Sequence, residues 1–230
     1  MEVRALVFDV FGTVVDWRGG VAREAARLLG DAVDPFALAD DWRGRYQPSL
    51  EEVRSGRRPF APLDVLHRES LDAVLTAAGS AGTPPAVREE LVLAWHRLDP
   101  WPDVLPGLAR LRRRFVLAPL SNGNVALLVD LARRAGLPWD LVLGAEIAGR
   151  YKPDPAVYDS VPRLLAVPPS AVLMVAAHGD DLAAARARGL RTAYVHRPDE
   201  FGGRPVPPAE DPDADLSVPS FEELADRLGA

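Results

Sequence analysis

Four short apolar runs without polar alternation constrain the fold of this chain more than any other feature of its sequence. They are rich in Val, Leu, Ile and Phe, turn residues bound each of them, and they span residues 3–9, 115–121, 171–177 and 191–196. Such runs are typical of parallel strands that are buried on both faces. Helical patterns lie at 124–137, 155–167 and 181–190, and a weaker strand pattern lies at 141–147. Strands that alternate with helices predict an α/β fold with a doubly wound parallel sheet.

A long helical stretch separates the first apolar run from the second. Apolar residues recur every three to four positions in residues 21–30, 35–47, 62–79 and 86–98. An insertion after the first strand of a parallel sheet lies over the carboxyl ends of the strands, where such sheets bind ligands. We therefore predict a core of residues 1–15 and 99–230 and an all-helical cap of residues 16–98. The Pro-rich, acidic stretch 202–219 is predicted to be a surface loop before a last helix that Ser220 caps.

Composition excludes several classes of protein. The formal net charge of -6 argues against a nucleic-acid partner, because affinity for the phosphate backbone rests on Lys and Arg. The chain has no cysteine, so thiol nucleophiles, disulfides and thiolate metal sites are excluded. No apolar stretch approaches the about 18 residues of a membrane span, and no secretion signal is apparent. We expect a cytoplasmic protein with no membrane partner.

Polar residues follow the ends of the predicted strands. Asp9 ends the first run, and Gly12 and Thr13 come shortly after it. The second run ends in Ser121-Asn122-Gly123-Asn124, which precedes a helix and offers a site for an anion. Lys152, the only lysine of the chain, follows the weaker strand, and His178 and Asp181 follow the run 171–177. The carboxyl ends of parallel strands share one edge of the sheet, so these groups are predicted to form one site.

These four segments resemble the motifs of the haloacid dehalogenase superfamily. They read DVFGT (9–13), SNGN (121–124), YKPDP (151–155) and AAHGDDL (176–182), and their order spans nearly the whole chain. The resemblance implies a Rossmann-like core, with the helical insertion as the superfamily's cap.

Two activities are the main alternatives within this superfamily. A phosphatase of this type needs an aspartate two residues after the nucleophile to protonate its leaving group, and a further carboxylate to hold Mg²⁺. This chain has Phe11 and Ala177 at those positions. A halide leaves as a stable anion and needs no proton, so a dehalogenase with no metal and no cofactor is expected. The alternative is a Mg²⁺-dependent phosphatase acting on a small phosphate ester, with Asp180 as a replacement ligand. A catalytically silent binding protein is a third hypothesis.

The closer resemblance is to the L-2-haloacid dehalogenases of type II, which carry an aromatic residue at the position of Phe11 and a Trp-Arg pair like Trp42-Arg43. The resemblance implies that the Asp9 carboxylate displaces halide from the α-carbon of a 2-haloacid with inversion, and that water then hydrolyses the aspartyl ester. Expected substrates are chloroacetate, L-2-chloropropionate and fluoroacetate, and a homodimer is a common family state. The implied roles are halide binding by Arg43, Asn122 and Trp42, carboxylate binding by Ser121 and the backbone of Val10 and Phe11, and orientation of Asp9 and Lys152 by Thr13, Tyr158 and Asp181.

The fourth motif departs from the family pattern. The well-known dehalogenases supply Ser, Asn and Trp where this chain has Ala176, His178 and Asp180. His178 is a candidate base for the hydrolytic water, because imidazole titrates near neutrality. A purely structural role for His178 is the alternative, and Asp181 is the other candidate for orienting the water.

Overall fold

A parallel sheet of five strands lies at the centre of the part of the chain that the computed structural model describes, residues 2–203 and 205–230. The strand order is β4-β1-β5-β6-β7. The strands are β1 (Ala5–Phe8), β4 (Val116–Pro119), β5 (Val172–Ala176), β6 (Arg191–Val195) and β7 (Leu216–Val218). Ala5 pairs with Val116 on one side and with Val172 on the other. The chain after β1 therefore emerges between the carboxyl ends of β4 and β5.

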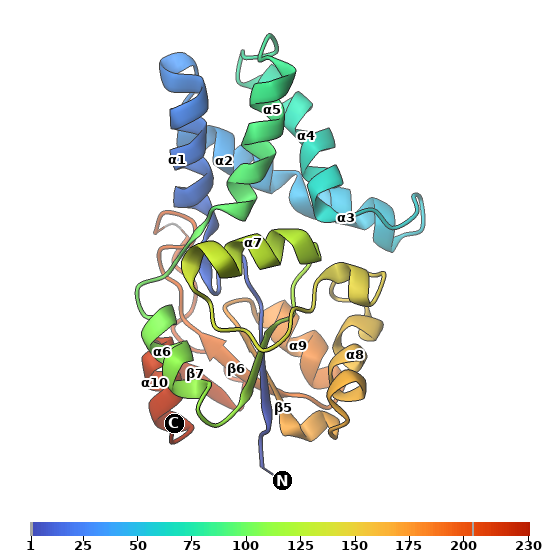
Figure 1. Cartoon of the computed structure of the whole chain (residues 1–230), viewed down its shortest axis with the longest axis vertical. Coiled ribbons are helices and arrows are strands. Elements are labelled where there is room, and N and C mark those ends of the chain that lie inside the picture. The colour runs from blue at the N-terminus through green and yellow to red at the C-terminus, as the bar shows by residue number, and fades with distance from the viewer. Residues whose placement is uncertain (1, 204) are drawn as a thin grey trace.

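Helices cover both faces of this sheet (Figure 1). Side chains of β1 alternate between two hydrophobic clusters, with Leu6 and Phe8 in one and Val7 in the other. The first cluster includes residues of α6 (Val104–Leu111), α7 (Val125–Ala135) and α10 (Phe221–Arg227). The second includes residues of α8 (Pro155–Leu165) and α9 (Gly179–Ala187). The predicted doubly wound α/β fold is confirmed.

The insertion after β1 forms a group of helices beyond the carboxyl end of the sheet (Figure 1). These helices are α1 (Trp17–Leu29), α2 (Pro35–Gly44), α3 (Tyr46–Arg54), α4 (Leu63–Ala77) and α5 (Pro85–Val92). Asp16 caps α1 by accepting the Gly19 amide at 2.8 Å, and Asp34 caps α2. Short 3-10 turns are η1 (Gly30–Ala32), η2 (Leu93–His96), η3 (Ala145–Ile147) and η4 (Pro169–Ala171). None of the helices in the described residues is long and apolar enough to cross a membrane.

The two connections between these helices and the sheet run side by side. β2 (Val15–Asp16) pairs antiparallel with β3 (Asp99–Pro100). The Trp101 amide continues the contact by donating to the Val14 carbonyl at 3.0 Å. Residues 16–98 remain our proposal for the cap, and this two-stranded ribbon lies where that proposal puts its boundary.

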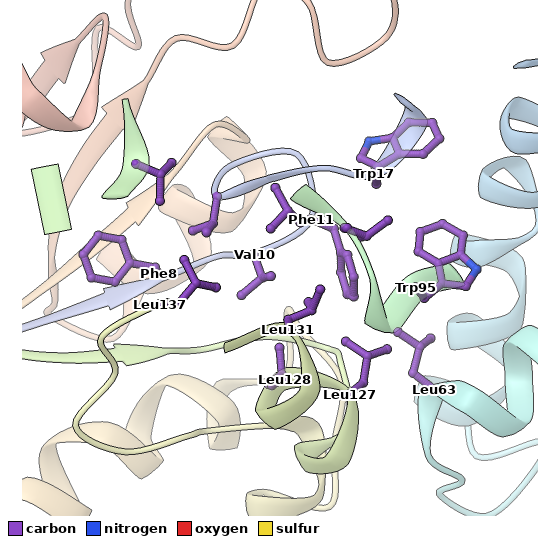
Figure 2. Packing of buried hydrophobic residues seen from close by; sticks show 14 of the residues in the cluster. Phe8, Val10, Phe11, Trp17, Leu63, Trp95, Leu127, Leu128, Leu131 and Leu137 are labelled. Atoms are coloured by element: carbon purple, nitrogen blue, oxygen red, sulfur yellow. The ribbon is translucent and has the colours of Figure 1, made fainter. Parts of the chain in front are cut away.

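Aromatic and aliphatic packing continues from the sheet into the insertion. Figure 2 shows Phe11 between the residues around β1 and Trp95 of η2, and the two rings meet edge to face with centroids 5.8 Å apart. Leu63 of α4 and Leu127 of α7 belong to the same cluster (Figure 2). The insertion is thus packed onto the core through one shared hydrophobic cluster, and the loop after Asp9 lies within it.

The structure corrects three sequence-based expectations. The weak strand at 141–147 is not formed: Leu143 makes a single bridge to Leu120, and the chain then turns into η3 after Gly144. The predicted loop 202–219 contains β7, a three-residue edge strand that is too short to leave an apolar pattern. The helical pattern 35–47 falls in two helices, because α2 ends before Arg45 and α3 begins after it.

Candidate active site

Asp9 lies at the carboxyl end of β1 and is only 9% exposed. Its Oδ2 accepts a hydrogen bond from Thr13 Oγ1 at 2.9 Å, and its Oδ1 lies 3.4 Å from the ammonium of Lys152. Thr13 Oγ1 also accepts the Ala177 amide at 2.9 Å, which ties the loop after β1 to the end of β5. Burial raises the pKa of Asp9, but Lys152 together with His178 and Thr13 outweighs burial and holds that pKa well below its usual value. Asp9 is therefore an anion at neutral pH.

Lys152 lies between two carboxylates. Its Nζ is 2.6 Å from Asp181 Oδ2 and 3.4 Å from Asp9 Oδ1, and the residue is only 6% exposed. Burial lowers the pKa of Lys152, but the charges of Asp181 and Asp9 outweigh burial and raise it. Tyr158 donates its hydroxyl to the other oxygen of Asp181 at 2.6 Å. Both oxygens of Asp181 are thus engaged, and the ammonium is fixed beside Asp9.

His178 follows β5 and contacts the Asp9 oxygen that Lys152 does not contact. Its Nδ1 is 3.1 Å from Asp9 Oδ2, and its Nε2 is 3.0 Å from each oxygen of Glu200. Burial lowers the pKa of His178, but the hydrogen bonds to Asp9 and Glu200 outweigh burial and raise it to about 10. In the free protein the imidazole is a cation between two carboxylates.

The insertion supplies the opposite wall. Asn122 donates from Nδ2 to the Tyr46 hydroxyl at 3.0 Å and accepts the Lys152 amide on Oδ1 at 2.8 Å. The Arg43 guanidinium lies over the Tyr46 ring at 4.3 Å and over the Trp17 ring at 5.2 Å. Its Nη1 is buried and has no hydrogen-bond partner among the described residues. An unpaired guanidinium nitrogen framed by aromatic rings suits a small anion.

These walls enclose a cavity of about 1000 Å³. Most of the predicted site residues line it: Asp9, Phe11, Arg43, Asn122, Lys152, Tyr158, His178 and Asp181. Val10, Thr13, Trp42 and Ser121 are not among the described residues of its lining. Thr13 acts on Asp9 through the hydrogen bond given above, whereas Ser121 Oγ accepts the Gly123 amide at 3.1 Å.

Trp42 packs away from the cavity. Its indole Nε1 donates to the His67 carbonyl at 3.2 Å and to Ser70 Oγ at 3.1 Å, and its ring meets Trp95 edge to face. Arg43 therefore lines the cavity, whereas its neighbour Trp42 does not.

The acidic and imidazole side chains around Asp9 are not arranged as metal ligands. The described residues contain no group of three or more His, Cys, Asp or Glu side chains placed to hold a metal ion. Phe11 and Ala177 occupy the positions where a phosphatase of this type would need carboxylates, and Thr13, His178 and Lys152 already contact the Asp9 oxygens. The residues do not fit a magnesium site.

Comparison with known proteins assigns the family. Residues 3–189 match the haloacid dehalogenase-like hydrolase family. The chain is 32% identical to (S)-2-haloacid dehalogenase 1 of Pseudomonas sp. (strain CBS-3) over 210 residues, which are 88% of this chain and 90% of that protein. The chain belongs to the (S)-2-haloacid dehalogenase family. This result confirms the resemblance carried by the four motifs.

Two solved structures of this family are similar to the chain over almost its whole length. The defluorinating L-2-haloacid dehalogenase Rha0230 is 46% identical, with a TM-score of 0.94 over 99% of this chain and 96% of that one. The L-2-haloacid dehalogenase of Xanthobacter autotrophicus with chloropropionic acid covalently bound is 26% identical, with a TM-score of 0.84 over 99% of each chain.

Tyr46 and Glu200 are among the residues around the site that the sequence analysis missed. Tyr46 begins α3 three residues after Arg43, and helical spacing from Arg43 is the signal that would have placed it on the same side of the insertion. Glu200 gives no such signal, because it lies in a loop after β6 and beyond residues 3–189 of the family match. Only the folded chain brings it to His178.

Proposed function

We propose that this dehalogenase family member hydrolyses short-chain 2-haloalkanoic acids to 2-hydroxy acids through an aspartyl ester on Asp9. The observation that supports this proposal best is the anionic Asp9 side chain, which is buried at the end of β1, lies beside an ammonium and lines the same cavity as Phe11. The activities in the names of the similar proteins support the same reaction. The covalently bound chloropropionic acid in one of them supports an ester intermediate.

In the first step the Asp9 carboxylate attacks the α-carbon and the carbon–halogen bond breaks with inversion. A buried, unprotonated carboxylate is a competent nucleophile because little water has to be removed from it. We assign the leaving halide to Arg43, whose unpartnered Nη1 faces no competing acceptor among the described residues, and to Asn122. Lys152 keeps Asp9 ionised and correctly placed.

In the second step water attacks the carbonyl carbon of the Asp9 ester. The hydroxy acid leaves, and the Asp9 carboxylate is restored with an oxygen from water. In this scheme Thr13 keeps the Asp9 side chain in one orientation, and Tyr158 with Asp181 keeps Lys152 in place. We retain the backbone of Val10 and Phe11, with Ser121, as the proposed site of the substrate carboxylate, and Trp42 as packing support for Arg43.

Substrates, partners and location complete the proposal. Chloroacetate, L-2-chloropropionate and fluoroacetate are the proposed substrates, and fluoroacetate is included because the 46% identical relative is described as defluorinating. No cofactor is proposed, because the residues around Asp9 do not fit a metal. We also propose a cytoplasmic homodimer without nucleic-acid or membrane partners.

Halide release tests the function directly. Purified protein with EDTA and each of the three acids should release halide and form the 2-hydroxy acid. Asp9→Asn should abolish turnover, whereas Asp31→Asn, an exposed aspartate in η1, should leave it unchanged. A single turnover in ¹⁸O-water should place label in Asp9. Mg²⁺-dependent hydrolysis of p-nitrophenyl phosphate with no halide release would instead support the phosphatase alternative.

A further inference from the structure

His178 has both ring nitrogens engaged by carboxylates, and the second carboxylate has no part in the reaction proposed above. Nδ1 faces Asp9 at 3.1 Å, and Nε2 faces both oxygens of Glu200 at 3.0 Å. A carboxylate only accepts hydrogen bonds. When the imidazole is neutral, Glu200 therefore favours the tautomer with the proton on Nε2, and this tautomer leaves the Nδ1 lone pair facing Asp9.

Glu200 is rigidly held. The residue is 3% exposed, and its Oε1 accepts the Trp17 indole N–H at 3.1 Å. A β-carbon on Gly12 would overlap the Glu200 carboxylate, so the loop after β1 makes room for it. The segment before Glu200 is anchored by Arg197, which donates to the Thr13 carbonyl at 2.9 Å and makes a bidentate ion pair with Asp103.

Asp181, the other candidate for handling the water, is already occupied. One oxygen accepts from Lys152 at 2.6 Å and the other from Tyr158 at 2.6 Å. Protonation of Asp181 by water would remove the charge that pairs with Lys152. His178 needs only to lose the proton that it shares with Asp9.

We propose that Glu200 is a positioning residue for ester hydrolysis, which holds His178 in the tautomer and orientation that let Nδ1 take a proton from the attacking water. The proposal rests on the function proposed above and adds to it a residue outside the four motifs. It also assigns His178 a role as the base of the second step only.

The charge on Asp9 separates the two steps. In the free protein Asp9 and Glu200 both stabilise the imidazolium, while Lys152, which is paired with Asp181, contacts the other oxygen of Asp9. Alkylation converts the Asp9 carboxylate into a neutral ester, and one of the two anions that stabilise the imidazolium is lost. The pKa of His178 then falls, and the imidazolium can release its proton to solvent.

The protons and electron pairs balance over the cycle. The Asp9 oxygen forms a bond to the α-carbon, and the halide leaves with the bonding pair. Nδ1 takes a proton from water as the hydroxide oxygen bonds to the ester carbonyl carbon. Collapse breaks the bond between the carbonyl carbon and the alkoxide oxygen, and the alkoxide takes the proton from His178. Asp9 is left as an acid and transfers its proton to His178, which restores the starting ion pair.

Rapid-mixing kinetics with chloroacetate separate the two steps. Glu200→Gln replaces an acceptor by an amide that can donate to Nε2, so it removes the tautomer preference while nearly keeping the shape. We expect it to release the first halide at the wild-type rate and then to turn over about 100-fold more slowly, within the range that general bases contribute. Intact-protein mass spectrometry should show the ester accumulating. Glu210→Gln, a change of an exposed glutamate in the same loop, should behave as the wild type.

The double variant shows whether Glu200 acts through His178. Glu200→Gln should add less than about threefold to the defect of His178→Gln, because coupled residues are not additive. On the acid side of its pH profile, the rate of ester hydrolysis should begin to rise at a lower pH in Glu200→Gln than in the wild type. Glu200→Asp, which keeps the anion, should recover part of the rate. Slowing of the first halide release, no ester accumulation, or a full defect in the His178→Gln background would overturn the proposal. Absence of halide release by the wild type would instead reject the proposed function.

Discussion

At the scale of the residue, the site is defined by one ammonium held between two carboxylates. Lys152 reaches Asp181 at 2.6 Å and Asp9 at 3.4 Å, and the residue is only 6% exposed. A compact ammonium fits between two acids that are this close, whereas a planar guanidinium with five donors would reorient both. The geometry required here is that of a lysine, in a chain that otherwise carries its positive charge on arginine.

We therefore expect Lys152→Arg to be nearly as damaging as Lys152→Ala. Both should reduce halide release by about 100-fold or more, because displacing a reacting group by about 1 Å has an effect of that size. The measurement is steady-state chloride release from L-2-chloropropionate. Arg163→Lys, a change on the exposed side of α8, serves as a control of the same chemistry. Near-normal turnover of the arginine variant would show that charge alone is sufficient.

His67 is a buried histidine without a hydrogen-bond partner. It stacks on Trp95 with centroids 4.3 Å apart, and neither ring nitrogen is paired within the described residues. A buried polar group without a partner costs about 1–3 kcal/mol, and an aromatic ring of similar shape would keep the stacking. His67→Phe should raise the free energy of unfolding by about 1 kcal/mol. Urea unfolding measures this change, and His67→Gln, which keeps a polar group in place, should give no increase.

At the scale of the element, a histidine joins the insertion to the core. His96 of η2 lies 2.7 Å from Asp130 of α7 through Nδ1 and 3.1 Å from Asp64 of α4 through Nε2. Asp64 in turn accepts a hydrogen bond from Asn124 at 2.8 Å, so the predicted second motif and the insertion share one polar network. Burial lowers the pKa of His96, but the two aspartates outweigh burial and raise it.

Asp130→Asn should weaken this connection in a pH-dependent way. Asp130 is largely exposed, so the loss should be modest, about 0.5–1 kcal/mol in the free energy of unfolding at pH 6. The loss should shrink at higher pH, where His96 is neutral in both proteins. Denaturant unfolding at several pH values measures it. A loss that does not change with pH would mean that the ion pair contributes nothing.

The sequence predicted the buried strands better than the segments at the edges of the sheet and in the loops. The runs around β1, β4, β5 and β6 were recognisable because burial on both faces removes polar residues from a strand. The weak run 141–147 was wrongly predicted as a strand, because an apolar pattern cannot show that only Leu143 pairs with a neighbouring segment. The meeting of Asp9, Lys152 and His178 in one cavity was predictable, because each of them lies in a motif that follows a predicted strand. Glu200 was not predictable, because its position depends on the Arg197 anchor and on the space above Gly12.

At the scale of the whole molecule, three histidines with shifted pKa values give opposite pH dependences. Burial lowers the pKa of His67 to about 3, so the unfolded chain binds this proton more tightly and stability falls as the pH drops from about 6.5 toward 3. The raised pKa values of His96 and His178 act in the other direction. Their contribution is fully present below about 6.5 and is lost as the pH rises, for His178 up to about 10.

We therefore expect the melting temperature to be highest near pH 6.5 and to fall on both sides. Thermal unfolding followed by circular dichroism between pH 5 and pH 9.5 would show the two limbs. His67→Phe should flatten the acid limb, and His178→Gln should flatten the alkaline limb. Stability that increases steadily from pH 6.5 to 9.5 would contradict the charged state that we assign to His178.

The single lysine also provides a natural chemical probe of the site. Acylating reagents that select primary amines find only one side chain to modify, and this side chain is 6% exposed and occupied by two acids. Modification at Lys152 therefore requires the ammonium to leave its two carboxylates, and its rate, read by peptide mass spectrometry, measures how often that happens. A time course with and without a slowly turned-over acid would show whether a bound acid changes the rate at which the Lys152 ammonium is released.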